Sequence, residues 1–327
     1  MTSSLDRARG CLVGLAIGDA MGAPAENMTA EAIAHRWGRV TGFLTDARSG
    51  TDDTEYAAFS AILLLEHGSA LTSDHVADAW IEHLTRRTEG FPGAGFSELG
   101  TVENLRAGLR PPASGEHLHS WSDGLAMRSA VHGVFAAGDP AEAARLAAID
   151  GAVSHAGEGI YAGQAVAAAV AAAMAGADVD DVVAAAARTV PANSWTARSI
   201  HQAREHAGDA GRSGRPLDVP ALLDTLVTRR YPWTDLAPEA VGIAVAAFIA
   251  AGGRFADAVP LAVSMGRDAD TTAAISGAMA GALGGYEAIP ADWTDIGPVT
   301  GRCLGDVVRG LHLSGLAERL AEARDAR

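Results

Sequence analysis

The chain of 327 residues contains no lysine, so its 25 basic side chains are all arginines, against 40 acidic side chains. We attribute the missing lysine to genomic base composition, which carries little chemistry. The net charge of −15 argues against binding to a nucleic acid duplex, because an acidic surface repels phosphates. One phosphorylated small ligand in a locally positive pocket is compatible with this charge.

Cysteine and long apolar runs are also scarce. Cys11 and Cys303 cannot form a disulfide framework in a chain of this length, which indicates a reducing cytoplasm. No group of Cys and His residues has the spacing of a zinc site. The most apolar stretches, 165–177 and 240–251, fall short of the roughly 18 residues typical of a membrane span, and the first residues lack the apolar core of a signal peptide. We therefore expect a cytoplasmic protein with no membrane partner.

What is abundant is alanine within a globular composition, with 48 % hydrophobic, 20 % charged and 5 % aromatic residues. Alanine favours closely packed helices. Apolar residues at helical spacing predict helices over 5–16, 55–66, 73–84, 126–137, 141–153, 159–175, 179–190, 238–250, 255–265, 271–283 and 304–324. No segment alternates as a strand does, although 40–44 could be a short extended piece. We predict one all-α domain spanning 1–327, with a long functional loop at the Gly- and Pro-rich segment 90–122.

Two acidic motifs each precede a predicted helix. Asp52 and Asp53 are flanked by threonines, and Asp268 and Asp270 precede Thr271. Such hard oxygen ligands suit Mg²⁺, Mn²⁺ or Ca²⁺. The alternative is that these residues merely cap the two helices. If the motifs meet in the fold they could hold two cations, which would neutralise the repulsion among the carboxylates.

Three further motifs stand out. The segment 18–26 combines small residues with Asp19 and Glu26, and its alternative is a plain helix end followed by a turn. Gly124 stands at a predicted helix start, where free N–H groups can hold a phosphate or a sugar hydroxyl, while Arg128 is expected to form a structural ion pair. His155 lies in a small-residue segment, and a lone histidine is usually structural.

In this order the motifs resemble those of the ADP-ribosylglycohydrolase family, together with Gly277, Gly281 and the segment 280–293. The resemblance covers about residues 7–308. It implies an all-α, multi-helix bundle with a cleft that contains two divalent cations, Mg²⁺ or Mn²⁺. By resemblance, the expected metal ligands are Thr51, Asp52, Asp53, Asp268, Asp270 and Thr271.

The resemblance also implies a substrate site and a catalytic carboxylate. The residues expected at the substrate are Asp19, Gly124, Leu125, Ala126 and His155, with residues 124–126 acting through their backbone. Glu26 corresponds to a carboxylate near the metal and the ligand. Some relatives place a catalytic Asp in the variable loop, where the best match here is Glu98.

This arrangement predicts hydrolysis of an N-glycosidic bond to ribose through an oxocarbenium-like transition state. Cations would orient the ribose hydroxyls and acidify the attacking water, and Glu26 or Glu98 would accept its proton. No G-x-S-x-G motif of a serine hydrolase is present.

Three functions fit these motifs. The first is release of ADP-ribose from an ADP-ribosylated protein or small acceptor. The second is hydrolysis of a nucleoside-like riboside, and the third is a non-catalytic, crystallin-like role. Arg106 and Arg110 are the basic residues of segment 90–122 that could bind a pyrophosphate, but backbone N–H groups could bind it instead, so the small number of arginines does not separate the first two functions. The oligomeric state is not predicted.

Overall fold

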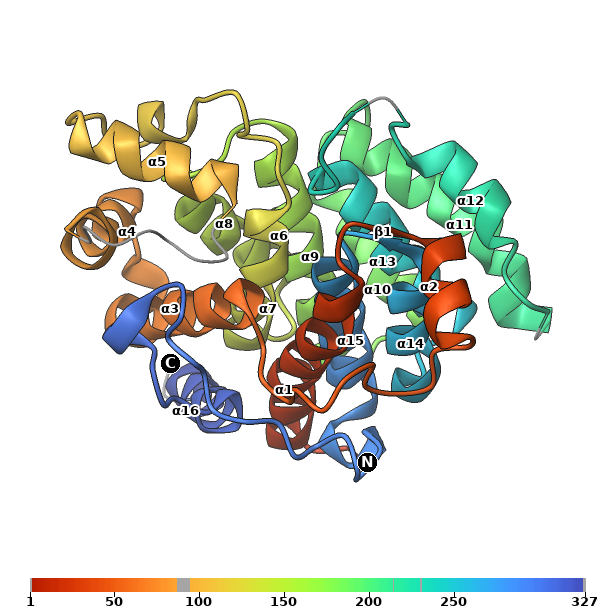
Figure 1. Cartoon of the computed structure of the whole chain (residues 1–327). Helices are drawn as coiled ribbons and strands as arrows, with labels where there is room; N and C mark the ends of the chain where they lie inside the picture. Colours follow the sequence, from red (N-terminus) through yellow and green to blue (C-terminus); the bar gives the residue numbers. More distant parts are fainter. Residues whose placement is uncertain (1, 87–94, 214, 230, 326–327) are drawn as a thin grey trace.

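The computed structural model describes residues 2–86, 95–213, 215–229 and 231–325, and helices dominate these residues (Figure 1). The all-α prediction is therefore confirmed. The helices are α1 (Ser4–Gly22), α2 (Ala30–Trp37), α3 (Asp52–His67), α4 (Ser73–Trp80), α5 (Phe96–Arg106), α6 (Gly124–Arg128), α7 (Ala130–Phe135), α8 (Pro140–Gly151), α9 (Glu158–Met174), α10 (Val179–Arg188), α11 (Trp195–Ser213), α12 (Val219–Leu226), α13 (Ala237–Ala250), α14 (Phe255–Met265), α15 (Ala269–Gly284) and α16 (Leu313–Asp325).

Helices α1 and α15 lie side by side in the middle of the molecule (Figure 1). Glycines spaced four apart on α1 share one helix face. A Cβ added to any of them would lie between 2.1 and 2.5 Å from a backbone oxygen of α15. Glycine is therefore required for the two backbones to touch. These glycines are Gly10, Gly14, Gly18 and Gly22.

The remaining helices surround this pair. Helices α11 and α12 cover one side of the molecule, and α4 and α5 lie on the opposite side (Figure 1). Helix α16 packs against α1, α3 and α7. The alanine-rich α9 is buried along most of its length and contacts α7, α8 and α10. No helix in the described part of the chain is both long and apolar enough to span a membrane.

A very short sheet connects two motifs that are distant in sequence. Strand β1 (Met28–Thr29) pairs antiparallel with β2 (Gly266–Arg267), with Met28 opposite Arg267. Gly266 has φ 71°, and a Cβ there would lie 2.3 Å from the Met28 oxygen. This pairing fixes the segment that follows Glu26 beside the segment that precedes Asp268.

Several predicted boundaries differ from the structure. The segment 90–122 contains α5, so its described residues are not one long loop. Helices α2, α11 and α12 were not predicted. The helix expected over 304–324 begins only at Leu313, because Gly305 and Gly310 adopt positive φ and break the chain before it. The segment 40–44 forms no strand.

Candidate active site

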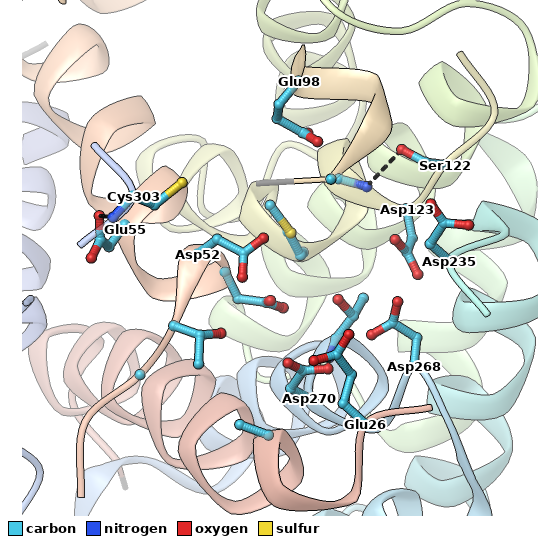
Figure 2. A pocket seen from close by; sticks show the side chains of 18 of the residues that line it. Glu26, Asp52, Glu55, Glu98, Ser122, Asp123, Asp235, Asp268, Asp270 and Cys303 are labelled. Atoms are coloured by element: carbon cyan, nitrogen blue, oxygen red, sulfur yellow. Dashed lines mark hydrogen bonds between the residues drawn. The ribbon is translucent and has the colours of Figure 1, made fainter. Parts of the chain in front are cut away.

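A cavity of about 630 Å³ lies between the starts of α3, α6 and α15. The start of α5 and the loops 233–235 and 300–303 complete its wall. Figure 2 shows carboxylates projecting into this space from several sides. Among the described residues, the acidic lining residues are Glu26, Asp52, Asp53, Glu55, Glu98, Asp123, Asp235, Asp268 and Asp270.

The start of α3 is capped from another helix. Asp19 on α1 accepts hydrogen bonds from the Thr51 N–H at 2.7 Å and the Thr51 hydroxyl at 2.8 Å. It also accepts from the Thr54 N–H at 3.0 Å and the Thr54 hydroxyl at 2.5 Å. Asp19 therefore fills the capping role of a helix start, which leaves Asp52 and Asp53 free for other contacts. Its fully buried carboxylate lies behind the cavity wall and is not one of the lining residues.

The start of α15 brings the second acidic motif to the same cavity. Asp268 is the N-cap residue of α15 but makes no side-chain capping hydrogen bond, and Asp270 lies in the first turn. Both carboxylates are nearly buried and line the cavity. Helices α3 and α15 contact each other, and carboxylate oxygens of Asp53 and Asp270 lie within 4.8 Å of each other at the two helix starts. The convergence expected of the two motifs is thus present in the structure.

The innermost part of this acidic group suits a cation. Asp19, Asp53 and Asp270 each offer a carboxylate oxygen, and these oxygens lie within 4.8 Å of one another. Asp53 Oδ1 is buried and has no hydrogen-bond partner among the described residues. An unpartnered buried carboxylate oxygen is costly unless a cation or donor satisfies it. The donor set, all oxygen, fits Mg²⁺ or Mn²⁺.

The electrostatics of the cavity point the same way. Burial raises the pKa of Asp53 well above its ordinary value, and the carboxylates of Asp19 and Asp52 raise it further. Burial is likewise the main cause of the raised pKa of Asp52, with Asp19 and Glu98 adding to it. Burial and then Asp268 raise the pKa of Asp270. Without a cation the cluster therefore favours protons, and a cation would have to displace them.

This leads to a prediction for stability against pH. Because their folded-state pKa values are raised, these aspartates stabilise the fold at low pH. That stability is lost as the pH rises from about 4, the pKa of aspartate in the unfolded chain, through the raised pKa values of the folded state. The pKa of Asp235, another aspartate that lines the cavity, is raised to about 6. A tenfold difference in proton affinity is worth about 1.4 kcal/mol, or roughly 3 °C of Tm. We expect Tm without divalent cation to fall by at least that much between mildly acidic and mildly alkaline buffer.

Saturating Mg²⁺ should reverse this fall, so its stabilising effect should be larger in the alkaline buffer. Thermal denaturation with and without Mg²⁺, at matched ionic strength, measures both effects. A Tm that does not depend on pH in the absence of cation would contradict the prediction. A larger Mg²⁺ effect in acid would contradict it equally.

Glu98 faces the aspartates from the opposite wall (Figure 2). It lies in the first turn of α5 and is 3 % exposed. Its Oε2 accepts a hydrogen bond from the Ser97 hydroxyl at 2.7 Å, and its Oε1 has no partner among the described residues. A Cβ on Gly124 would lie 2.3 Å from Oε1, so the carboxylate fits because residue 124 is glycine.

Glu26 occupies a more open position. It lines the cavity but is exposed, and its Oε1 accepts a hydrogen bond from the Asn27 amide at 2.9 Å. Partial burial of its carboxyl group at the cavity, followed by the nearby Asp268, raises its pKa. Both candidate catalytic carboxylates thus reach the cavity, and Glu98 is the more enclosed of the two.

The expected substrate residues divide into two groups. Gly124 lines the cavity at the start of α6, whereas the side chains of Leu125 and Ala126 are buried in the core and do not. His155 is 1 % exposed and does not line the cavity either. Its Nε2 lies 3.1 Å from the hydroxyl of Ser122, which does line it. His155 therefore reaches the site through another side chain.

Arg128 forms the structural ion pair expected of it. It is buried and contacts Asp150 at 3.3 Å. Although burial opposes it, Arg128, His132 and Ser60 together lower the pKa of Asp150 below its ordinary value. The carboxylate of Asp150 consequently stays charged and holds Arg128 beneath the cavity wall.

Other lining residues were missed from sequence. Asp123 is buried with an unpartnered Oδ2, and its neighbour in the motif, Gly124, could have drawn attention to it. Asp235 and Arg302 lie in segments where the sequence shows no motif that would indicate a functional site. Arg302 is the one basic residue among the described residues that line the cavity.

The two arginines considered for phosphate binding do not line the cavity. Arg110 pairs with Asp74 at 2.9 Å and with Asp78 at 2.7 Å, and Arg106 pairs with Glu103 at 2.5 Å. Neither guanidinium is therefore free to grip a pyrophosphate in the cavity.

Comparison with known proteins agrees with this architecture. The model of the family described as "ADP-ribosylglycohydrolase" matches residues 1–327. A protein of Archaeoglobus fulgidus is 31% identical over 302 residues, which cover 89% of this chain and 91% of that protein. A solved structure described as an ADP-ribosylglycohydrolase-related protein complex shares the fold, with a TM-score of 0.68 and 24% identity over 99% of this chain and 100% of that chain. The chain therefore belongs to the ADP-ribosylglycohydrolase family and is a hydrolase of that type.

Proposed function

We propose that this protein uses divalent cations to hydrolyse an N-glycosidic bond to ribose, releasing ADP-ribose from an ADP-ribosylated protein or small acceptor. One observation carries the proposal. The two acidic helix starts, at Asp52–Asp53 and Asp268–Asp270, line one cavity and face Glu98 across it. A volume of about 630 Å³ is within the range of small-molecule sites.

The carboxylates and threonines at the two helix starts would hold the cations. Mg²⁺ or Mn²⁺ bound there supplies a Lewis acid that orients vicinal ribose hydroxyls and makes water a better nucleophile. The residues that would hold them are Thr51, Asp52, Asp53, Asp268, Asp270 and Thr271.

The chain's own part in the chemistry is assigned to Glu98. Its unpartnered Oε1 is positioned to accept a proton from water that attacks the anomeric carbon. The same negative charge stabilises the positive charge that develops on the ribose ring in the transition state. The bond to nitrogen breaks and the acceptor leaves with a proton, while ribose C1 gains the hydroxyl.

Phosphate recognition is assigned to Arg302, the basic side chain at the cavity. A hydrogen bond to a charged partner contributes about 1.5 kcal/mol or more, equivalent to about tenfold in affinity. We expect Arg302→Gln to raise KM about tenfold for ADP-ribosyl-arginine and to leave KM for phosphate-free N-ribosides unchanged. Steady-state kinetics on both substrates measures this. Arg254→Gln, a surface residue paired with Asp257, is the matched control. An equal effect on both substrates would remove Arg302 from phosphate binding.

The test of the proposed function is a panel of substrates at saturating Mg²⁺ and Mn²⁺. ADP-ribosyl-arginine, whose glycosidic bond is to nitrogen, is compared with ADP-ribosyl-serine, whose bond is to oxygen, and with simple N-ribosides, and free ADP-ribose is detected by chromatography. We expect ADP-ribose release that stops when the cation is chelated. Hydrolysis of N-ribosides without binding of ADP-ribose would overturn the proposal in favour of a nucleosidase. Cation binding with no hydrolysis of any substrate would indicate a non-catalytic relative.

A further inference from the structure

A chain of hydrogen bonds connects Glu98 to the protein interior. The Ser97 hydroxyl donates to Glu98 Oε2 at 2.7 Å, and the Ser122 hydroxyl donates to Ser97 Oγ at 2.7 Å. Ser122 Oγ also lies 3.1 Å from His155 Nε2. A buried imidazole thus reaches the cavity carboxylate through two hydroxyl groups.

The proton positions in this chain follow from donor and acceptor capacities. Ser154 Oγ accepts from the Arg128 guanidinium at 2.9 Å, and it lies 2.8 Å from His155 Nδ1. An arginine can only donate, so the single proton of the Ser154 hydroxyl is available for Nδ1. Ser97 donates its one hydroxyl proton to Glu98, and Ser122 donates its own to Ser97. Ser122 Oγ can thus only accept from His155. The imidazole proton therefore resides on Nε2 and is donated to Ser122, which leaves Nδ1 to accept from Ser154. Every donor in the chain therefore points toward Glu98.

The surroundings keep this order fixed. Burial, followed by the charges of Arg128 and His117, lowers the pKa of His155 well below its ordinary value, so the ring is neutral. Arg128 is in turn held by Asp150 and by the Gly124 carbonyl, to which it donates at 2.8 Å. The interior end of the hydrogen-bond chain is thus the buried ion pair of Arg128 and Asp150, whose side chains are held in place by these contacts.

At the cavity end of the hydrogen-bond chain, the Glu98 carboxylate lies in a narrow slot between two glycines. A Cβ on Gly95 would lie 2.8 Å from Glu98 Oε2, and a Cβ on Gly124 would lie 2.3 Å from Oε1. The hydrogen bond from Ser97 anchors Oε2, which leaves Oε1 as the oxygen without a protein partner among the described residues. The carboxylate is therefore held at one oxygen and available at the other.

We propose that His155 is a positioning residue that acts on Glu98 through the hydroxyls of Ser122 and Ser97, and that it does not contact the substrate. This inference rests on the role assigned to Glu98 in the proposed function. Pre-orienting a catalytic group raises kcat, whereas a contact made equally with bound substrate and transition state changes KM.

Kinetics on ADP-ribosyl-arginine tests the chain. One neutral hydrogen bond contributes a factor of about 3 to 10. We expect Ser122→Ala to lower kcat by that factor, and Ser97→Ala, which loses a bond to the carboxylate itself, by at least that factor, with KM unchanged in both. Ser122→Thr, which keeps the hydroxyl at the cavity, should restore kcat. Ser129→Ala is the matched control, because Ser129 is equally buried but its hydroxyl donates to the Leu125 carbonyl, outside the chain.

A double mutant separates action through Glu98 from independent effects. If the chain acts on this carboxylate, Ser122→Ala should cause no further loss of kcat in a Glu98→Gln background. An additive loss would overturn the inference. A raised KM with unchanged kcat would do so too, because it would make Ser122 a substrate contact. Wild-type kcat in Glu98→Gln would instead remove the role assigned to Glu98.

A spectroscopic measurement tests the hydrogen-bond chain independently of enzyme activity. In ¹⁵N-histidine-labelled protein, with the resonances assigned by comparison with His155→Gln, we expect His155 to be neutral at pH 7 and to carry its proton on Nε2. Ser122→Ala should shift the Nε2 resonance, while Ser129→Ala should not. A proton on Nδ1, or a charged ring, would overturn the inference even in an active enzyme. If the wild type is inactive but the Nε2 proton is found, the proposed function fails and the hydrogen-bond chain stands.

Discussion

We expect Asp53→Asn to lower kcat/KM about 10³-fold and to abolish tight binding of Mg²⁺ or Mn²⁺. A catalytic cation contributes several kcal/mol to transition-state stabilisation, and each 1.36 kcal/mol is about tenfold in rate. Asp53 is central because its buried Oδ1 has no other partner among the described residues and its carboxylate lies close to those of Asp19 and Asp270. Titration calorimetry with each cation and hydrolysis of ADP-ribosyl-arginine measure the two losses.

In mildly alkaline buffer without cation, where the cluster has lost its protons, the same substitution should raise Tm, because it removes one of several mutually repelling buried carboxylates. Activity loss combined with a stability gain excludes unfolding as the cause. Asp46→Asn, at an exposed residue of the neighbouring loop, is the control and should change neither property. Wild-type cation affinity in Asp53→Asn would show that the cation site lies elsewhere.

The second large effect is expected from Glu98→Gln, with kcat lowered about 10²–10⁴-fold, the usual range for a lost general base. Glutamine has the same shape and can remain in the slot between Gly95 and Gly124, so the fold and the affinity for ADP-ribose should persist. Single-turnover hydrolysis together with calorimetric binding of ADP-ribose separates chemistry from binding.

Glu26→Gln is the matched comparison, because Glu26 is also a cavity carboxylate but is exposed and already bonded to Asn27. We expect a smaller loss of kcat in this variant. If Glu26→Gln is the more damaging substitution, the role of base passes to Glu26. Undiminished turnover in both variants would show that neither Glu26 nor Glu98 is the general base.

The sequence was informative where the signal is local. The periodicity over 255–265 matches α14 residue for residue. The paired Asp and Thr motifs were correctly placed at two helix starts, but they do not precede the helices, because Asp52 and Asp53 are the first residues of α3 and Asp270 lies in the first turn of α15. By contrast, the Gly and Pro content of 90–122 concealed α5, which includes Gly100 and directly follows Gly95. Helix α11 was missed because it is polar along much of its length and its buried stripe consists of Ile200 and small residues such as Ala203 and Ala207, which give a weak apolar signal.

Contacts between distant segments limited the prediction of the site. The capping alternative for Asp52 and Asp53 could not be excluded from sequence, since the actual capping residue, Asp19, belongs to another helix. The glycines of α1 are visible at a spacing of four, but nothing in that pattern names α15 as the partner. Asp235 reaches the cavity because the Asp123 N–H donates to its carbonyl at 2.9 Å, a pairing without a sequence signal.

The contact between α1 and α15 has a consequence for how the protein is made. Helix α1 leaves the ribosome well before α15, yet its glycine face is covered by residues 269–284. About 250 residues must be translated between the two helices, which takes roughly 12 to 50 s at ordinary elongation rates. During that time the nascent chain exposes an apolar helix whose partner does not yet exist, so α1 is a natural binding segment for chaperones. The carboxylate pocket, which needs both helices, is among the last parts of the molecule to be assembled.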